Sequence, residues 1–248
     1  VGGEKFSAEK FIIAAGSTAV IPPIKNIKEV GYLTHIEALR LKKQPKELVV
    51  IGAGPVGLEF AQMYSGFGTK VAILQRDKSI FGNSEPELIA RLAEILRGED
   101  IIIKTGVDIK SARKENGKKI ITFEIGGKQD EISADEILLA AGKMPNIGGL
   151  ELKNAGVKVN SRNAIMADKF FQTNKPYIFA IGDVSNAPLR LETTAGHEGT
   201  LVVENIISGA KNSIGYDSVP YAIFTDPQLA SVGWTEERQI KETGSCAC

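Results

Sequence analysis

Three glycines in the segment LVVIGAGPVGLE, residues 48–59, have the spacing of a dinucleotide-binding loop. Gly52 would make a tight turn, Gly54 would let the backbone approach a pyrophosphate, and Gly57 would let a helix pack closely on a strand. The pattern therefore predicts that this loop binds a dinucleotide. The alternative is a glycine-rich turn without a ligand.

The flanking sequence predicts the elements that such a loop needs. The apolar run before Gly52 indicates a strand, and Pro55 and Val56 open an amphipathic stretch that indicates a helix. The free N–H groups and the positive dipole end of that helix would face the phosphates. A second apolar run at residues 70–74 completes a strand–helix–strand unit.

The residues after this second strand predict which nucleotide is bound. An acid there would bind the ribose 2′-hydroxyl of NADH, whereas an arginine suits the 2′-phosphate of NADPH. Gln75 takes the place of the acid, and Arg76 follows it. We expect NADPH to be preferred over NADH; the alternative is that Arg76 is a solvated charge without a role in binding.

Three further apolar segments indicate strands that end at a possible ligand site. Residues 11–16 and 137–142 both end in Ala-Ala-Gly, which favours two related nucleotide-binding halves, although any buried strand with a terminal glycine looks alike. The third segment, residues 177–183, carries Asp183 directly after Gly182. Ligands bind at the carboxyl ends of strands in open α/β sheets, so Asp183 is placed to accept hydrogen bonds from ligand hydroxyls. A capping role for Asp183 is the alternative.

Other elements follow from local patterns. Ser84-Glu-Pro-Glu87 predicts a helix start with Ser84 as its cap, and residues 107–125 predict a strand meander. A short amphipathic helix is expected at residues 34–43. The β-type residues and prolines from Val219 onward indicate the first strands of another domain.

The composition excludes several classes of protein. The chain has 248 residues, 43% of them hydrophobic, and its 30 basic residues equal its 30 acidic ones, so we expect no nucleic-acid partner. No apolar stretch approaches the ~20 residues of a membrane span, so we expect no membrane association. The only cysteines, Cys246 and Cys248, exclude a disulfide framework and indicate a reduced, cytoplasmic setting. They are weak candidates for metal ligands, and no other metal site is expected.

Taken in chain order, five motifs resemble those of the flavoprotein pyridine nucleotide-disulfide oxidoreductases. The resemblance extends to about Glu237, and it departs from the family pattern where Lys143 replaces an arginine. The motifs run from the turn that closes the first FAD segment to the opening of the dimer-interface domain, and they lie at residues 14–17, 52–59, 141–146, 180–183 and 224–233.

The resemblance implies a doubly wound α/β fold in which an NAD(P)-binding domain is inserted in a partial FAD-binding domain. The implied FAD-binding parts are residues 1–43 and 148–217, the NAD(P)-binding domain is residues 44–147, and the dimer-interface domain starts within residues 218–248. The implied FAD contacts are Ala15, Gly16, Gly182 and Asp183. For NAD(P) the family pattern adds Gly142 and Glu59. Glu59 would lie near the nicotinamide amide, and a surface or capping role is the alternative for it.

The chain departs from the family in the residues that perform the disulfide chemistry. The N-terminal FAD fingerprint and the redox Cys-x4-Cys pair are absent, and neither His35 nor His197 lies in the motif of the catalytic histidine. The catalytic residues are therefore unknown. The sequence, which begins at Val1, is expected to be the central fragment of a longer, homodimeric enzyme in which NAD(P)H gives a hydride to FAD and electrons pass on to a disulfide.

Within the family, residues 71–76 and 219–228 are most similar to the mercuric reductase branch, and dihydrolipoamide dehydrogenase is the alternative. A non-catalytic nucleotide-binding module is the alternative from another class, because the redox cysteines are absent. A flavin-free dehydrogenase fits less well, because the Asp183 motif has no role without FAD.

Overall fold

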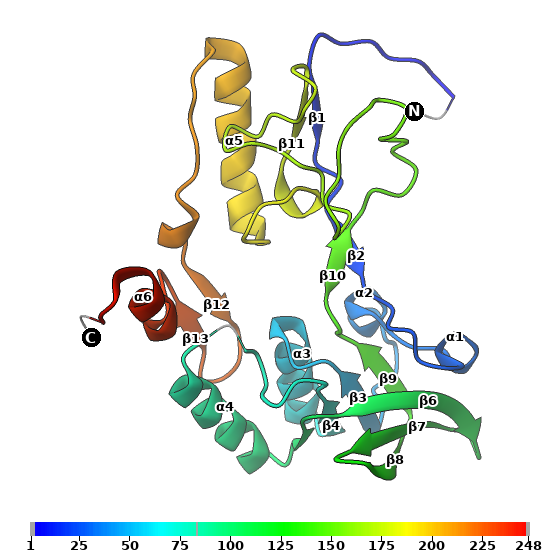
Figure 1. The fold of residues 1–248 in the computed structure, drawn as a ribbon. Coiled ribbons are helices and arrows are strands. Elements are labelled where there is room, and N and C mark those ends of the chain that lie inside the picture. The colour runs from blue at the N-terminus through cyan, green and yellow to red at the C-terminus, as the bar shows by residue number, and fades with distance from the viewer. Residues whose placement is uncertain (1–2, 83, 247–248) are drawn as a thin grey trace. The chain divides into compact units, whose positions relative to one another are not determined.

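The computed structural model describes residues 3–82 and 84–246, and it divides into two compact units. Unit 1 contains residues 1–18 and 143–219, and unit 2 contains residues 19–142 and 220–248. Figure 1 follows the elements of both units along the chain. Each unit mixes helices with strands, so the fold is of the mixed α/β class. No helix in the described part of the chain is long and apolar enough to cross a membrane.

Unit 2 is built on a parallel sheet with the strand order β5-β4-β3-β9 (Figure 1). The strands are β3 (Glu47–Ile51), β4 (Lys70–Leu74), β5 (Ile102–Lys104) and β9 (Glu136–Leu139). The interior residues of β3, β4 and β9 are buried. This burial is expected for parallel strands that are covered on both faces.

One face of this sheet packs against helices. They are α3 (Pro55–Gly66) and α4 (Pro86–Gly98), and their buried residues Leu58 and Leu96 share a core cluster with Val50 of β3. α3 begins where β3 and the glycine loop end, and it leads back to β4, which pairs in parallel with β3, so the three elements form a βαβ unit.

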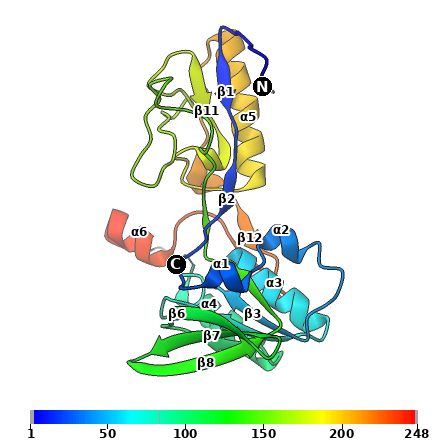
Figure 2. The same cartoon turned by 90° about the vertical axis from the view of Figure 1, so that its right-hand side faces the viewer.

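The other face packs against an antiparallel meander, which is drawn in green in Figure 2. Its strands are β6 (Asp108–Glu115), β7 (Lys118–Ile125) and β8 (Lys128–Ala134). Ile121 and Phe123 of β7 share a core cluster with Val49 and Leu139 of the parallel sheet. Val49 and Val50 thus point to opposite faces, as successive residues of a strand do.

Two other segments complete unit 2. Residues 19–43 contain α1 (Ile27–Val30) and α2 (His35–Ala38). Residues 220–246 contain β12 (Tyr221–Ile223), its antiparallel partner β13 (Leu229–Ser231), and α6 (Glu236–Thr243).

Unit 1 contains a smaller sheet and one long helix. β1 (Phe11–Ile13) pairs in parallel with β11 (Ile178–Ala180), and α5 (Glu192–Ser208) lies beside them (Figure 2). Val202 of α5 packs with Phe171 and Phe179 in the core. The remaining elements are β2 (Ser17–Ala19) paired with β10 (Lys143–Pro145), and the 3₁₀ turns η1 (Gly182–Val184) and η2 (Tyr216–Ser218).

The boundaries of the units differ from the boundaries that the sequence suggests. The expectation grouped residues 19–43 with the partial FAD-binding domain, but the structure places them in unit 2. Ile27 and Val30 are buried in the core cluster between the parallel sheet and the meander, and Ala38 is buried in the core cluster between the parallel sheet and the helices α3 and α4. Residues 220–246 also pack in unit 2, because Ile223 and Leu229 are buried beside the α3 and α4 residues.

Candidate nucleotide-binding sites

The glycine loop lies at the carboxyl end of β3, and its glycines are needed for different reasons. Gly52 has a φ of +106°, and a Cβ there would lie 2.4 Å from the carbonyl oxygen of Ala140. A Cβ on Gly57 would lie 2.0 Å from the carbonyl oxygen of Gly52. A Cβ on Gly54 would meet no atom within 4 Å, so the backbone at Gly54 is open to a ligand. Two glycines therefore serve close packing, and the third leaves room for a bound group.

The first turn of α3 suits an anion. Gly54 is the N-cap residue and supplies no capping side chain, while Pro55 occupies the first turn, where its missing N–H is not needed. Val56 follows in the same turn, which carries no acidic side chain. The N–H groups of this turn are thus available to a phosphate.

The end of β4 brings together three polar side chains. Gln75 Oε1 accepts a hydrogen bond from the backbone N–H of Ala53 at 2.9 Å, so Gln75 holds the glycine loop. Gln75 Nε2 donates to Asp77 Oδ2 at 3.0 Å. Arg76 Nε lies 3.6 Å from Asp77 Oδ1, and the Arg76 side chain is 88% exposed. The sequence analysis singled out Gln75 and Arg76 but not Asp77, whose link to Gln75 depends on side-chain orientation.

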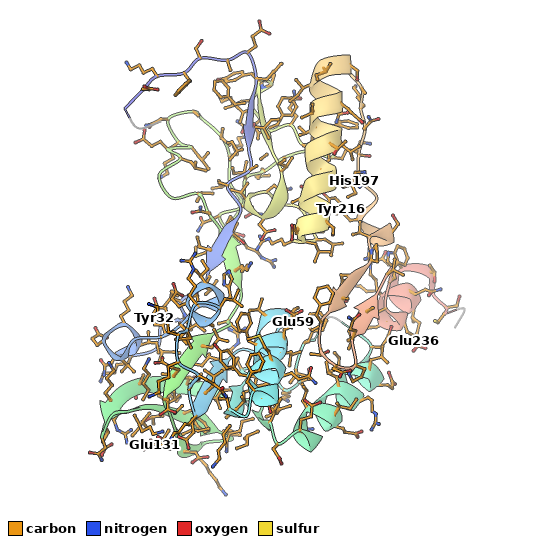
Figure 3. All side chains as sticks on the ribbon, turned by 180° about the vertical axis from the view of Figure 1, so that it is seen from behind. Tyr32, Glu59, Glu131, His197, Tyr216 and Glu236 are labelled. Carbon is orange, nitrogen blue, oxygen red and sulfur yellow. The ribbon has the colours of Figure 1, made fainter. Side chains whose placement is uncertain are left out.

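Glu59 is half-buried on α3 and contacts the segment after β12. Its Oε1 accepts a hydrogen bond from the backbone N–H of Phe224 at 2.9 Å, and Figure 3 shows Glu59 on α3. Gln62, one turn later, accepts from the N–H of Asp226 at 2.7 Å and donates to its carbonyl oxygen at 2.8 Å. These side chains fix the segment after β12 against α3.

An aromatic pair, which the sequence analysis missed, also lies beside the glycine loop. Phe81 donates its backbone N–H to the carbonyl oxygen of Ala53 at 3.0 Å, and its ring meets Tyr221 edge-on with the centroids 6.3 Å apart.

Gly142, the other residue expected at this site, follows β9 with a φ of +110°. Its carbonyl oxygen accepts from the N–H of Val20 at 2.9 Å.

Unit 1 brings most of the expected FAD-binding residues together. Gly16, Gly182 and Asp183 line one hollow of about 300 Å³. Ser17 Oγ donates to Asp183 Oδ2 at 2.6 Å, so the carboxylate is held in place while it lines the hollow. Ala15 is not among the lining residues; its carbonyl oxygen accepts from Asn146 Nδ2 at 3.2 Å instead.

A buried carboxylate holds this turn from behind. Glu198 of α5 is fully buried, and its Oε2 accepts from the backbone N–H of Gly182 at 2.6 Å. Its Oε1 accepts from the Tyr216 hydroxyl at 2.8 Å. Burial, together with the hydrogen bond to Glu198, raises the pKa of Tyr216 well above its usual range. Figure 3 shows Tyr216 beside α5.

The residues of this hollow fit a polar, anionic cofactor such as FAD. Asp183 can accept from hydroxyls, and the cations Lys143 and Arg190 line the same hollow. Thr194 Oγ1, in the first turn of α5, is buried without a hydrogen-bond partner in the described part of the chain. Thr194 does not itself line the hollow, although its neighbour Ala195 does, and a buried hydroxyl without a protein partner takes one from water or from a ligand. Glu192 in the same turn disfavours a phosphate directly at that helix end.

The remaining candidates do not gather into a site. His197 is exposed on α5, and His35 begins α2. Cys246 Sγ lies 3.8 Å from Gln239 Oε1, whereas Cys248 lies outside the described residues. Among residues 3–82 and 84–246, no group of three His, Cys, Asp or Glu side chains could hold a metal ion.

Comparison with known proteins identifies similar chains. A family described as pyridine nucleotide-disulphide oxidoreductase matches residues 1–206. A mercuric reductase of Staphylococcus aureus is 35% identical over 244 residues, which are 98% of this chain and 44% of that protein. A dihydrolipoyl dehydrogenase of Thermus scotoductus is 37% identical over 97% of this chain and 52% of that protein. The chain thus spans about half the length of these curated relatives.

A solved structure agrees with these sequence similarities. The HOCl-induced flavoprotein disulfide reductase RclA of Escherichia coli, in its Cu(II) complex, superposes with a TM-score of 0.86 at 31% identity. The superposition covers 95% of this chain and 54% of that one.

Proposed function

This chain belongs to the pyridine nucleotide-disulphide oxidoreductase family, and on that premise we propose that it binds NAD(P)H in unit 2 and FAD in unit 1. The observation that carries the proposal is the glycine loop. Packing leaves no space for a Cβ on Gly52 or Gly57, whereas the backbone of Gly54 has open space around it beside the first turn of α3. The 44–147 segment would then be the NAD(P)-binding domain, and residues 218–248 would start a dimer-interface domain.

The residues of the chain would bind and orient the nucleotides. The N–H groups of the first turn of α3 would hold the pyrophosphate, and Arg76 would contact the 2′-phosphate of NADPH. Asp183, held by Ser17, would accept from hydroxyl groups of FAD. FAD, when bound, supplies hydride acceptance and electron transfer to a disulfide.

Mercury(II) is the acceptor that we propose, because the mercuric reductase of S. aureus is similar over 98% of the chain. Dihydrolipoamide is the second candidate, since a dihydrolipoyl dehydrogenase is 37% identical. Either reaction needs a redox-active thiol pair, and the chain has no cysteines besides Cys246 and Cys248. We therefore place the pair in another part of a longer, cytoplasmic, homodimeric protein.

The cofactor preference can be tested by titrating the chain with NADPH and NADH by calorimetry. We expect NADPH to bind about tenfold more tightly, since one charge-assisted contact contributes about 1.5 kcal/mol or more. Arg76→Ala should remove this preference by weakening NADPH alone. Arg91→Ala, which removes another exposed arginine from α4, should leave both affinities unchanged.

Two results would contradict the proposal in different ways. Equal weakening of NADPH and NADH by Arg76→Ala would show that Arg76 does not contact the 2′-phosphate. Failure of the wild-type chain to bind either nucleotide would overturn the assignment of unit 2 as a nucleotide-binding unit.

A further inference from the structure

Asp77 follows the residues at the end of β4, and each of its carboxylate oxygens faces one of their side chains. Oδ2 accepts from Gln75 Nε2 at 3.0 Å, and Oδ1 lies 3.6 Å from Arg76 Nε. Its backbone is fixed as well, because its carbonyl oxygen accepts from the N–H of Gly106 at 2.9 Å. The carboxylate is therefore held beside Arg76.

Gln75 links the Asp77 carboxylate to the glycine loop. Its amide oxygen accepts from the N–H of Ala53, between Gly52 and Gly54, while its amide nitrogen holds Asp77. The backbone of Gln75 is bonded to the end of β5 and the residues after it: its N–H donates to the Lys104 carbonyl oxygen at 2.9 Å, and its carbonyl oxygen accepts from the N–H of Val107 at 3.0 Å. Gln75 thus holds an acid, Asp77, three residues beyond the last residue of β4.

We propose that Asp77 determines how strongly the chain discriminates NADPH from NADH, by opposing the 2′-phosphate and accepting from a 2′-hydroxyl. This inference rests on the proposed binding of nicotinamide nucleotides in unit 2. A 2′-phosphate on the Arg76 guanidinium would bring its negative charge to roughly 6 Å from the Asp77 carboxylate. Because Asp77 Oδ1 lies 3.6 Å from Arg76 Nε, Asp77 competes with the phosphate for the same cation.

The chemistry predicts opposite effects on the two nucleotides. Repulsion between a phosphate and a carboxylate at such a distance in water changes a binding constant by about threefold to tenfold. The 2′-hydroxyl of NADH is neutral and can donate to the carboxylate, so NADH is not opposed. Asp77 therefore lowers the preference for NADPH that Arg76 alone would give.

Asp77→Asn tests this inference with little change of shape. The asparagine keeps one oxygen that can accept from Gln75 Nε2, loses the negative charge, and has an amide NH2 in place of the second oxygen. We expect the ratio of the NADH Kd to the NADPH Kd, measured by calorimetry at low salt, to rise about tenfold. Glu94→Gln is the matched control, because Glu94 is also 65% exposed and is also paired with an arginine, Arg91 of α4.

The outcomes separate this inference from the proposed function. A rise in the ratio for Asp77→Asn, with a ratio within about twofold of wild type for Glu94→Gln, supports the role of Asp77. A ratio that changes no more in Asp77→Asn than in Glu94→Gln overturns it, while the binding of nucleotides by unit 2 stands. Absence of binding by the wild-type chain overturns both.

Discussion

The β3–β9 pair of unit 2 and the β1–β11 pair of unit 1 are alike in their strand direction and in the turns that follow them, but they differ in the size of their sheets. Both are parallel pairs, and both are followed by turns with left-handed glycines. The β3–β9 pair lies in a four-stranded sheet, whereas the β1–β11 pair forms a two-stranded sheet in which Phe11 and Ile12 are 42% and 41% exposed.

The candidate sites at these two pairs are fixed by different forces. In unit 2 the glycine loop is set by close packing, because Gly52 and Gly57 have no space for a Cβ. In unit 1 no atom lies within 4 Å of a Cβ on Gly16, and a Cβ on Gly182 would meet only the Ala195 Cβ, at 3.3 Å. The turn there is held by hydrogen bonds from Gly182 to Glu198 and from Ser17 to Asp183. Packing constrains one site, and a buried polar network constrains the other.

The largest effect is expected for Gly57→Ala in unit 2. The added Cβ would lie 2.0 Å from the Gly52 carbonyl oxygen, which is backbone and cannot swing away. We expect a loss of at least about 4 kcal/mol in the stability of unit 2, together with loss of nucleotide binding. Urea denaturation, followed by circular dichroism, and NADPH titration measure both.

Gly54→Ala is the control for this prediction. A Cβ there meets nothing within 4 Å, so stability should change little while NADPH binding weakens. Wild-type stability of Gly57→Ala would contradict the view that packing fixes this loop.

A smaller effect is expected when the polar network of unit 1 is cut. Glu198→Ala leaves the buried N–H of Gly182 and the hydroxyl of Tyr216 without their acceptor, which should cost about 3 kcal/mol. Tyr216→Phe removes one hydrogen bond and should cost about 1 kcal/mol. Amide hydrogen exchange of α5 and β11 reports the stability of unit 1 separately from unit 2. Unchanged exchange in Glu198→Ala would remove the distinction between the two units.

The smallest effect concerns the outer face of the meander of unit 2. The Arg113 guanidinium, followed by the Thr122 hydroxyl, lowers the pKa of Glu131 from 4.5 to about 2. Because the pKa is lower in the folded state, the stabilisation is complete above pH 4.5 and is lost as the pH falls towards 2. Both side chains are exposed, so solvent screening keeps the contribution small.

Glu131→Gln should therefore reduce the acid sensitivity of unit 2. The urea concentration at which β7 and β8 lose their protection from hydrogen exchange should fall more between pH 5 and pH 3 in the wild type than in the variant. Equal losses in the two proteins would show that the ion pair does not stabilise the meander.

The sequence predicted the βαβ unit and the close packing at Gly52 and Gly57 because these depend on local pattern and steric rules. It did not predict that residues 19–43 pack in unit 2. An apolar residue such as Ile27 indicates that it will be buried, but not against which part of the chain it will pack. Asp77 and Glu198 were missed because their roles depend on side-chain contacts between elements.

The start of α4 shows the same limit on a smaller scale. Ser84 was expected to cap this helix, but the N-cap residue is Glu85, without a capping hydrogen bond. Pro86 occupies the first turn, which sets the helix start one residue later than the pattern suggested. The Glu85 side chain instead accepts from the N–H of Glu236, a contact that no local pattern contains.

Hydrogen exchange of the chain with each nucleotide tests most directly whether each unit has its own nucleotide site. NADPH should protect amides at residues 52–59 and 75–77 of unit 2 and leave residues 13–16 and 181–184 of unit 1 unchanged. FAD should protect the unit 1 segments and leave the glycine loop unchanged. Protection of the same segments by both nucleotides, or protection of unit 1 by NADPH alone, would contradict the account.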